Sequence, residues 1–244
     1  MKLKTLLIGS IILLTTFLIY LTTLDKLVYF VALGDSLAKG TTPYGGNDYS
    51  YNDYLRNYIA NKNILEKYID DFIEEDYRTT DLIRDIEDNR QIIINDKKQT
   101  IKNALIKADL VTLSIGMNDL YYKINTTNLE TEDIYNHIDE MMEDMDKLFK
   151  LLRKYCKEDI IILNYFRQSS LLENDNITEF FNYANNKLQL KSKEFNIHYL
   201  EINKILENNP LYLPRPNSYF PSRNGYEAIG KKLTTKINET LLTN

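Results

Sequence analysis

Ser36 is the residue of this sequence that is best placed to act as a nucleophile. It follows the apolar run from Leu27 to Leu33 and comes directly after Gly34 and Asp35. A serine on a sharp turn between a strand and a helix, with a glycine before it that permits a tight backbone, has the geometry of an activated nucleophile. The segment therefore predicts nucleophilic chemistry at Ser36.

A second polar cluster can supply a donor for the oxyanion that such an attack creates. Residues 116–119 follow another apolar run, Leu110 to Ile115. The side chain of Asn118 in this cluster can donate a hydrogen bond to a developing oxyanion. The chemistry of a parallel α/β sheet lies at the carboxyl ends of its strands, so we expect the two clusters to meet there.

The glycines near Ser36 do not fit a phosphate-binding loop. Residues 34–41 read GDSLAKGT, in which Lys39 precedes Gly40. A Walker loop requires the opposite order, and the G-x-G-x-x-G spacing is also absent. We therefore do not expect nucleotide binding.

Charge and composition exclude further classes of function. The 244 residues carry a net charge of −5, and the basic residues are spread along the chain, which argues against nucleic-acid binding. The single cysteine, Cys156, cannot form an intrachain disulfide. Together with two distant histidines, His137 and His198, it has no metal-ligand spacing. We expect no metal and no cofactor.

The N-terminus predicts a membrane segment. Lys2 and Lys4 precede residues 5–24, which carry no charge. A helix of that length spans about 30 Å, the thickness of the hydrocarbon core. The lysines predict a cytoplasmic N-terminus and an extracellular domain at a bacterial cell membrane. A cleaved signal peptide is the alternative, although no small-x-small cleavage site precedes Asp25.

Strands alternate with helices in the rest of the chain, which predicts an α/β fold with a doubly wound, mostly parallel sheet flanked by helices. Without a linker or repeat, the chain divides into an anchor over residues 1–26 and one domain over residues 27–244. Predicted strands cover residues 27–33, 68–73, 110–115, 160–163 and 197–202, and predicted helices cover residues 51–59, 79–86, 100–107, 132–155, 177–195 and 226–242.

Three blocks in this order resemble the SGNH/GDSL hydrolase family of serine esterases and acylhydrolases. They read GDSL at residues 34–37, GMND at 116–119 and FPSRNGY at 220–226. The resemblance extends over residues 27–235. It implies a three-layer sandwich that hydrolyses carboxylic esters without a metal or cofactor.

The resemblance also implies a role for each matching residue. Ser36 would be the nucleophile and donate its own N–H to the oxyanion hole, Asn118 would be the side-chain oxyanion donor, and Gly116 would shape the oxyanion turn. The family usually has a further glycine donor before the segment YRTTDLI at residues 77–83, but this chain has no glycine between residues 47 and 115. Either the N–H of a residue such as Asp76 or Tyr77 takes that place, or this donor is absent.

The last block departs from the family pattern Asp-x-x-His-Pro. Asn217 and Phe220 stand in the positions of the acid and the base. Neither side chain can accept a proton from Ser36 at neutral pH. The resemblance therefore predicts impaired activity.

Lys39, one helical turn after Ser36, is a candidate substitute base, as in Ser–Lys enzymes. It would need desolvation to lower its pKa toward 7, and an ordinary solvated lysine is the alternative. Tyr219 and Tyr226 are weaker candidates, since a tyrosine has a pKa near 10.

Two functions remain open from the sequence. The first is an esterase, acylhydrolase or envelope O-deacetylase that acts on an ester-bearing small molecule or a cell-envelope polymer. The second is an inactive binding module for an acyl or glycan ligand or a partner protein. Because the strand from Leu27 starts at the membrane segment and ends near Ser36, about 23 Å further on, we expect the site to face away from the membrane.

Overall fold

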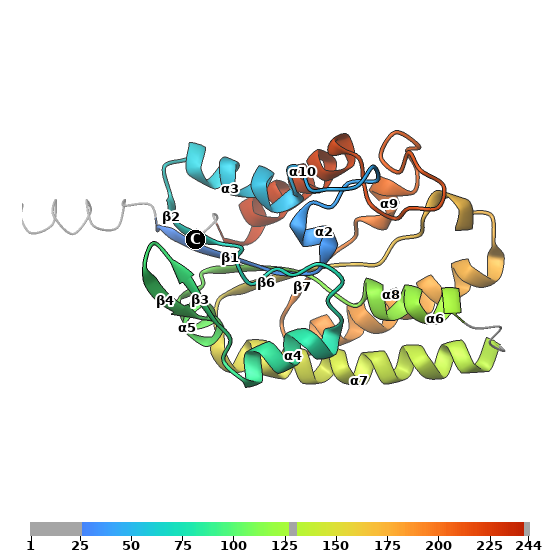
Figure 1. The fold of residues 1–244 in the computed structure, drawn as a ribbon, viewed down its shortest axis with the longest axis horizontal. Helices are drawn as coiled ribbons and strands as arrows, with labels where there is room; N and C mark the ends of the chain where they lie inside the picture. Colours follow the sequence, from blue (N-terminus) through green and yellow to red (C-terminus); the bar gives the residue numbers. More distant parts are fainter. Residues whose placement is uncertain (1–25, 127–130, 242–244) are drawn as a thin grey trace, which may run out of the picture.

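Five parallel strands in the order β2-β1-β5-β6-β7 form the middle layer of a three-layer α/β sandwich (Figure 1). The computed structural model describes residues 26–126 and 131–241. The predicted α/β fold with a parallel sheet is confirmed. The strands are β1 (Val28–Gly34), β2 (Leu65–Ile69), β5 (Leu110–Ser114), β6 (Asp159–Leu163) and β7 (His198–Leu200).

The two central strands show why the apolar runs predicted the sheet. Every residue of β1 and of β5 is buried. Helices cover both faces of a parallel sheet, so its strands contain continuous apolar runs instead of alternating ones. The register pairs Phe30 with Leu110 and Gly34 with Ser114, which brings the turns after β1 and β5 to the same edge.

Helices cover both faces of the sheet, as Figure 1 shows. On one face α3 (Tyr51–Asn61) packs against α10 (Arg223–Thr240). On the other face α7 (Thr131–Tyr155) contacts α4 (Thr79–Glu87), α5 (Ile101–Lys107) and α8 (Asp175–Glu194). The remaining helical segments are α2 (Ser36–Lys39), α6 (Met117–Thr126), η1 (Ser169–Leu171) and α9 (Asn203–Leu206).

The second strand lies earlier in the chain than the sequence predicted. The prediction over residues 68–73 is wrong for residues 70–73, because β2 ends at Ile69. Phe72 and Ile73 are buried in the loop that follows. This apolar pair gives a strand-like pattern in the sequence. The charged residues Glu66 and Lys67 interrupt the apolar pattern at the start of β2, so the sequence does not reveal where that strand begins.

A hairpin that the sequence analysis did not predict precedes α5. It consists of the antiparallel strands β3 (Gln91–Ile94) and β4 (Lys97–Thr100). Asn95 and Asp96 between them have φ values of 49° and 61°. Two successive residues with positive φ are typical of the tight turns that join hairpin strands.

The predicted membrane segment, residues 5–24, lies outside the described residues. Within residues 26–126 and 131–241, no helix is long and apolar enough to cross a membrane.

Candidate active site

Ser36 lies on the strand-turn-helix junction that its sequence context predicted. β1 ends at Gly34, and Ser36 is the first residue of α2. Asp35 caps this short helix, because its Oδ1 accepts the N–H of Leu37 at 3.1 Å. Gly34 has a φ of +140°, and a Cβ there would lie 2.2 Å from the carbonyl oxygen of Ser114. Only glycine fits this close approach of the two strands.

The hydroxyl of Ser36 accepts a hydrogen bond from a distant backbone donor. The N–H of Asp76, in the loop after β2, lies 2.9 Å from Ser36 Oγ. Asp76 has a φ of +58°, the left-handed conformation that favours glycine. The structure therefore brings to Ser36 the donor that the resemblance implied, although the residue is not a glycine.

Two sets of contacts hold the Asp76 loop against the turn of Ser36. The N–H of Glu74 donates to the carbonyl oxygen of Gly34 at 3.3 Å. Arg90 forms ion pairs with Glu74 and, at 3.0 Å, with Asp85, and donates to the hydroxyl of Tyr77 at 3.1 Å. Tyr77 in turn donates to Asp85 at 2.9 Å. Burial and this bond raise the pKa of Tyr77 to about 12, so the hydroxyl stays a donor.

The first turn of α6 fixes the other side of the same loop. Asn118 donates from Nδ2 to the carbonyl oxygen of Tyr77 at 2.9 Å, and its Oδ1 accepts the hydroxyl of Tyr219 at 2.8 Å. The next residue, Asp119, accepts both the N–H and the hydroxyl of Thr79, at 3.0 and 3.1 Å. The segments of Asn118 and Asp76 are thus directly linked.

Gly116 is required by the turn that precedes Asn118. It has a φ of +96°, and a Cβ there would lie 2.5 Å from the hydroxyl oxygen of Tyr165. Tyr165 is fully buried, and its hydroxyl has no hydrogen-bond partner among the described residues. A larger residue at this position would displace the ring and, with it, the start of α6.

The loop over residues 217–220, which the resemblance aligns with the family's acid and base, carries aromatic side chains. Asn217 is exposed and Phe220 is half-buried. The ring of Phe220 lies 4.5 Å from that of Tyr219, which stacks on Tyr121 at 4.8 Å. The sequence analysis missed the bond from Tyr219 to Asn118, because the two residues are 101 positions apart.

The histidines are engaged elsewhere. His137 Nε2 lies 3.1 Å from the carbonyl oxygen of Asp119, and His198 Nε2 lies 2.8 Å from Asp159 Oδ1 at the amino ends of β7 and β6. In the part of the chain that the structure describes, neither histidine forms a hydrogen bond with Ser36.

The candidate substitute bases are not poised beside the nucleophile. Lys39 is exposed, and no hydrogen bond joins it to Ser36 within the described ranges. Burial raises the pKa of Tyr219, and the charges of Asp35 and Asp76 raise it further. Burial also raises the pKa of Tyr226, whose hydroxyl donates to the backbone. Neither tyrosine is therefore suited to accept a proton near neutral pH.

Asp35 is a titratable group that the sequence analysis did not single out. It is buried beside Ser36, and its Oδ1 also accepts the hydroxyl of Ser114 at 3.1 Å. Burial raises the pKa of Asp35 to about 7, although hydrogen bonds from Leu37 and Ser114 oppose the shift. A carboxyl group with a pKa near neutrality is thus the immediate chain neighbour of the nucleophile.

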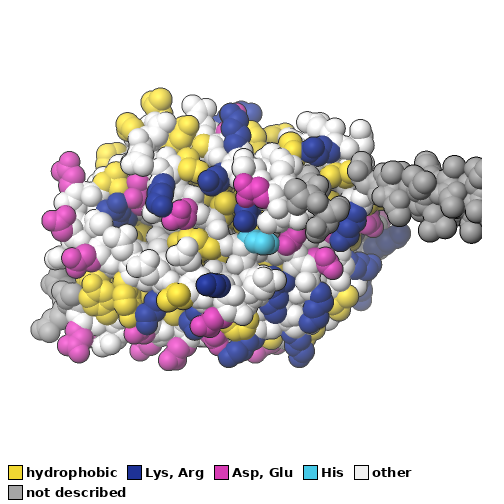
Figure 2. All heavy atoms as spheres, turned by 180° about the vertical axis from the view of Figure 1, so that it is seen from behind, with side chains coloured by type: hydrophobic (Ala, Val, Ile, Leu, Met, Phe, Trp, Pro, Cys, Tyr) yellow, Lys and Arg dark blue, Asp and Glu magenta, His cyan; other side chains and the backbone are white. Residues whose placement is uncertain are grey.

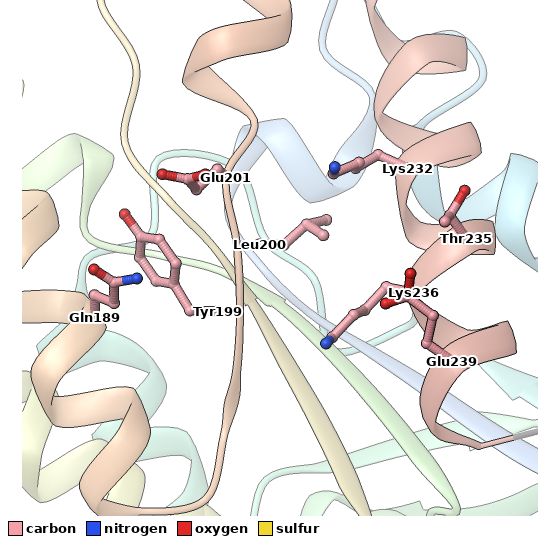
Figure 3. Close-up of a pocket in the computed structure, with 8 residues that line it drawn as sticks. All are labelled: Gln189, Tyr199, Leu200, Glu201, Lys232, Thr235, Lys236 and Glu239. Carbon is pink, nitrogen blue, oxygen red and sulfur yellow. The ribbon is translucent and has the colours of Figure 1, made fainter. Parts of the chain in front are cut away.

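A separate hollow lies along the edge strand β7, between α8 and α10 (Figure 3). Tyr199 and Glu201 line it from the strand side, and Lys232 and Lys236 line it from α10. Its walls include none of the residues around Ser36. It is therefore distinct from the candidate active site.

A parallel α/β sandwich with a serine on the turn after its first strand, and with a backbone N–H donated to that serine, is the arrangement of a serine hydrolase-like fold. The model of the GDSL-like lipase/acylhydrolase family matches residues 30–233. The chain belongs to this family.

Solved structures support the same fold. The lipase Lip_vut3 from a goat rumen metagenome superposes with a TM-score of 0.67 at 20% identity, covering 84% of this chain and 95% of its own. A catalytic mutant of Axe2, an acetylxylan esterase from Geobacillus stearothermophilus, gives a TM-score of 0.65 at 15% identity, covering 88% of this chain and 95% of its own. Comparison with curated proteins gives no match.

Proposed function

We propose that this chain is a serine ester hydrolase with Ser36 as its nucleophile. The observation that carries the proposal is the 2.9 Å hydrogen bond from the N–H of Asp76 to Ser36 Oγ, on the turn between β1 and α2 at the carboxyl edge of the sheet. In the reaction, Ser36 Oγ attacks the ester carbonyl carbon, the serine proton passes to the oxygen of the leaving group, and the alcohol departs. Water then attacks the acyl-serine and releases the acid.

Three donors are available for the oxyanion of the tetrahedral intermediate. They are the N–H groups of Ser36 and Asp76 and the side chain of Asn118. One hydrogen of Asn118 Nδ2 is used by the carbonyl oxygen of Tyr77. The other remains for the oxyanion, because an amide nitrogen has two donors. Removal of one such donor typically lowers the turnover number by a factor of about 10²–10³.

The proposed turnover is slow, because Phe220 and Asn217 cannot activate the serine. Where the base of a serine protease is lost, a residual acceleration of about 10³–10⁴ over water survives from the oxyanion hole and from binding. Lys39 serves as the base only if a bound substrate covers it and removes it from water.

A binding module without turnover is the second candidate. Phe220 and Asn217 favour it, since an aromatic ring and an amide at these positions suit contact with a ligand and not proton transfer. Such a module would hold an acyl or glycan group, or a partner protein, at the same edge of the sheet.

The proposed substrates are small esters or ester-bearing polymers of the cell envelope. The acetylxylan esterase Axe2 has the same fold, which supports an acetylated polymer as one substrate class. The proposed location is the outer face of a cell membrane, with residues 5–24 as an uncleaved anchor, because this stretch carries no charge and follows two lysines.

Turnover of p-nitrophenyl acetate and release of acetate from acetylated xylan test this function. The full chain in detergent is compared with its Ser36→Ala variant. We expect slow hydrolysis that the variant lacks. Equal rates for the two proteins would refute Ser36 as the nucleophile.

A further inference from the structure

The two ends of the sheet carry different charges. Exposed carboxylates gather on the loops at the carboxyl ends of the strands, around Ser36, where exposed Lys39, Arg215 and Arg223 also lie. Exposed lysines gather at the opposite end. The exposed carboxylates around the site are Asp48, Asp71, Glu75, Asp76, Glu173 and Asp175.

Each of the five parallel strands is preceded by at least one exposed lysine. We call the end of the molecule at which these lysines lie the basic end. Figure 2 shows Lys and Arg side chains gathered toward the side on which the described chain begins, and more Asp and Glu side chains toward the far side. The lysines of the basic end are Lys26 before β1, Lys62 before β2, Lys107 before β5, Lys154 and Lys157 before β6, and Lys193 before β7.

Two carboxylates at the basic end have partners within the protein, and Lys26 is one of these partners. Asp109 pairs with Lys26 at 2.8 Å and accepts the N–H of Tyr29 at 2.9 Å. Asp159 accepts His198 at 2.8 Å. Exposed carboxylates also lie among the lysines of this end, including Glu66, Glu158, Glu194 and Glu239.

Apolar side chains are exposed among these lysines. Leu27 is 51% exposed just before β1, and Ile106 is 64% exposed in the last turn of α5. Helix dipoles favour lysines at the C-terminal ends of helices, but they do not explain exposed aliphatic side chains. Lysines around exposed Leu and Ile are the combination that suits a bilayer surface, where cations meet anionic headgroups and apolar groups enter the acyl boundary.

We propose that the basic end lies on an anionic phospholipid bilayer and that Ser36 faces away from it. This inference rests on the proposed membrane anchor, residues 5–24, which ends two positions before Lys26. The lysines attract anionic lipid headgroups, whereas the carboxylates around Ser36 are repelled by them. The attraction acts within about 10 Å, which is the Debye length at 0.1 M salt, so it requires the basic end to contact the surface.

Energy transfer from single labels to acceptor lipids tests this orientation. The full chain is placed in vesicles of phosphatidylcholine alone or with phosphatidylglycerol. Cys156 is buried, so a donor dye attaches selectively to Lys157→Cys at the basic end or to Asp48→Cys beside the site. In anionic vesicles we expect at least threefold stronger transfer from position 157 than from position 48. Equal transfer, or stronger transfer from position 48, would overturn the inference.

Charge reversal identifies the cause of the orientation. The triple variant Lys62→Glu, Lys107→Glu, Lys193→Glu is expected to lose most of the difference between the two labels in anionic vesicles. The matched control reverses three lysines away from the basic end, Lys187, Lys204 and Lys231, and changes the net charge by the same amount. Loss of the difference in the control alone, or in both variants equally, would refute a role of the basic end.

Flotation of the same samples separates this inference from the proposed anchor. A chain that floats with neither kind of vesicle refutes the anchor, and the inference fails with it. A chain that floats with both, but shows equal energy transfer from the two labels, refutes the orientation alone.

Discussion

Asp76 donates its backbone N–H to Ser36 Oγ at 2.9 Å and does so from the left-handed conformation, at a φ of +58°. The hydroxyl of the candidate nucleophile therefore already lies beside a donor of the kind that stabilises an oxyanion. The bond also ties the loop after β2 to the turn after β1, so the position of the serine depends on a segment forty residues away.

Asp76→Gly is predicted to keep esterase activity within about twofold, because glycine retains the N–H and readily adopts a positive φ. Asp76→Pro removes the donor and is predicted to lower kcat by about 10²–10³. Steady-state kinetics with p-nitrophenyl acetate measure both effects.

Proline also conflicts with the positive φ at residue 76, so a backbone control is needed. Asn63 has a φ of +61° and donates its N–H to Ala60, away from Ser36. Asn63→Pro is therefore expected to suffer a similar loss of stability but to keep its kcat. If both proline variants lose the same activity, the bond from Asp76 has no specific role.

Tyr219→Phe is predicted to lower kcat about tenfold and the free energy of unfolding by about 1 kcal/mol, because Asn118 Oδ1 loses a neutral hydrogen bond and the amide is less firmly held. The KM value is expected to stay unchanged. Tyr183→Phe is the control, since it removes a hydroxyl bond to Asp139 at 2.9 Å, on α8 and α7. A kcat unchanged by Tyr219→Phe would show that Asn118 needs no such support.

Asp35 is predicted to make stability depend on pH. Burial raises its pKa from 3.8 to about 7, so between these values the folded protein keeps a proton that the unfolded chain releases. The free energy of unfolding then falls as pH rises through this window, by about 1.4 kcal/mol per unit, and the stabilisation is lost above pH 7.

Asp35→Asn removes this titration, and its amide oxygen can still accept from Leu37. Thermal unfolding of both proteins, followed by circular dichroism at pH 4.5, 5.5 and 6.5, is expected to show a Tm difference that grows with pH in favour of the variant. Asp71→Asn, at an exposed carboxylate, serves as control. Parallel curves for wild type and Asp35→Asn would disprove the prediction.

The double variant Asn217→Asp, Phe220→His is predicted to raise turnover at least a hundredfold, because general base catalysis typically contributes about 10²–10⁴. Phe220→His alone is expected to gain less, since no acid orients the imidazole. Rates of p-nitrophenyl acetate hydrolysis compare the three proteins. No gain in the double variant would mean that this loop does not carry the base position.

Local sequence patterns predicted most of the fold and the place of two residues of the candidate site. The apolar runs before Gly34 and Gly116 are buried parallel strands, and such strands have a continuous apolar signal. Ser36 and Asn118 directly follow these runs, so their places at one edge of the sheet could be inferred. The bounds of β2 were predicted too late in the chain, because polar residues at its start interrupt the apolar pattern.

The rest of the site depends on contacts that no local pattern records. The donor at Asp76 is a backbone N–H, which every residue except proline has, so its residue type gives no signal. The bond from Tyr219 to Asn118 joins segments 101 residues apart. The raised pKa of Asp35 arises from burial, which only the packed structure reveals.

Labelling of the full chain with a fluorophosphonate probe, next to Ser36→Ala, tests the central claim most directly. The probe bonds to a serine that can act as a nucleophile. We predict labelling of the wild-type chain that the variant lacks, accompanied by slow hydrolysis of p-nitrophenyl acetate. Absence of labelling in the wild type, with labelling restored by Asn217→Asp and Phe220→His, would contradict the account and indicate a binding module on a hydrolase fold.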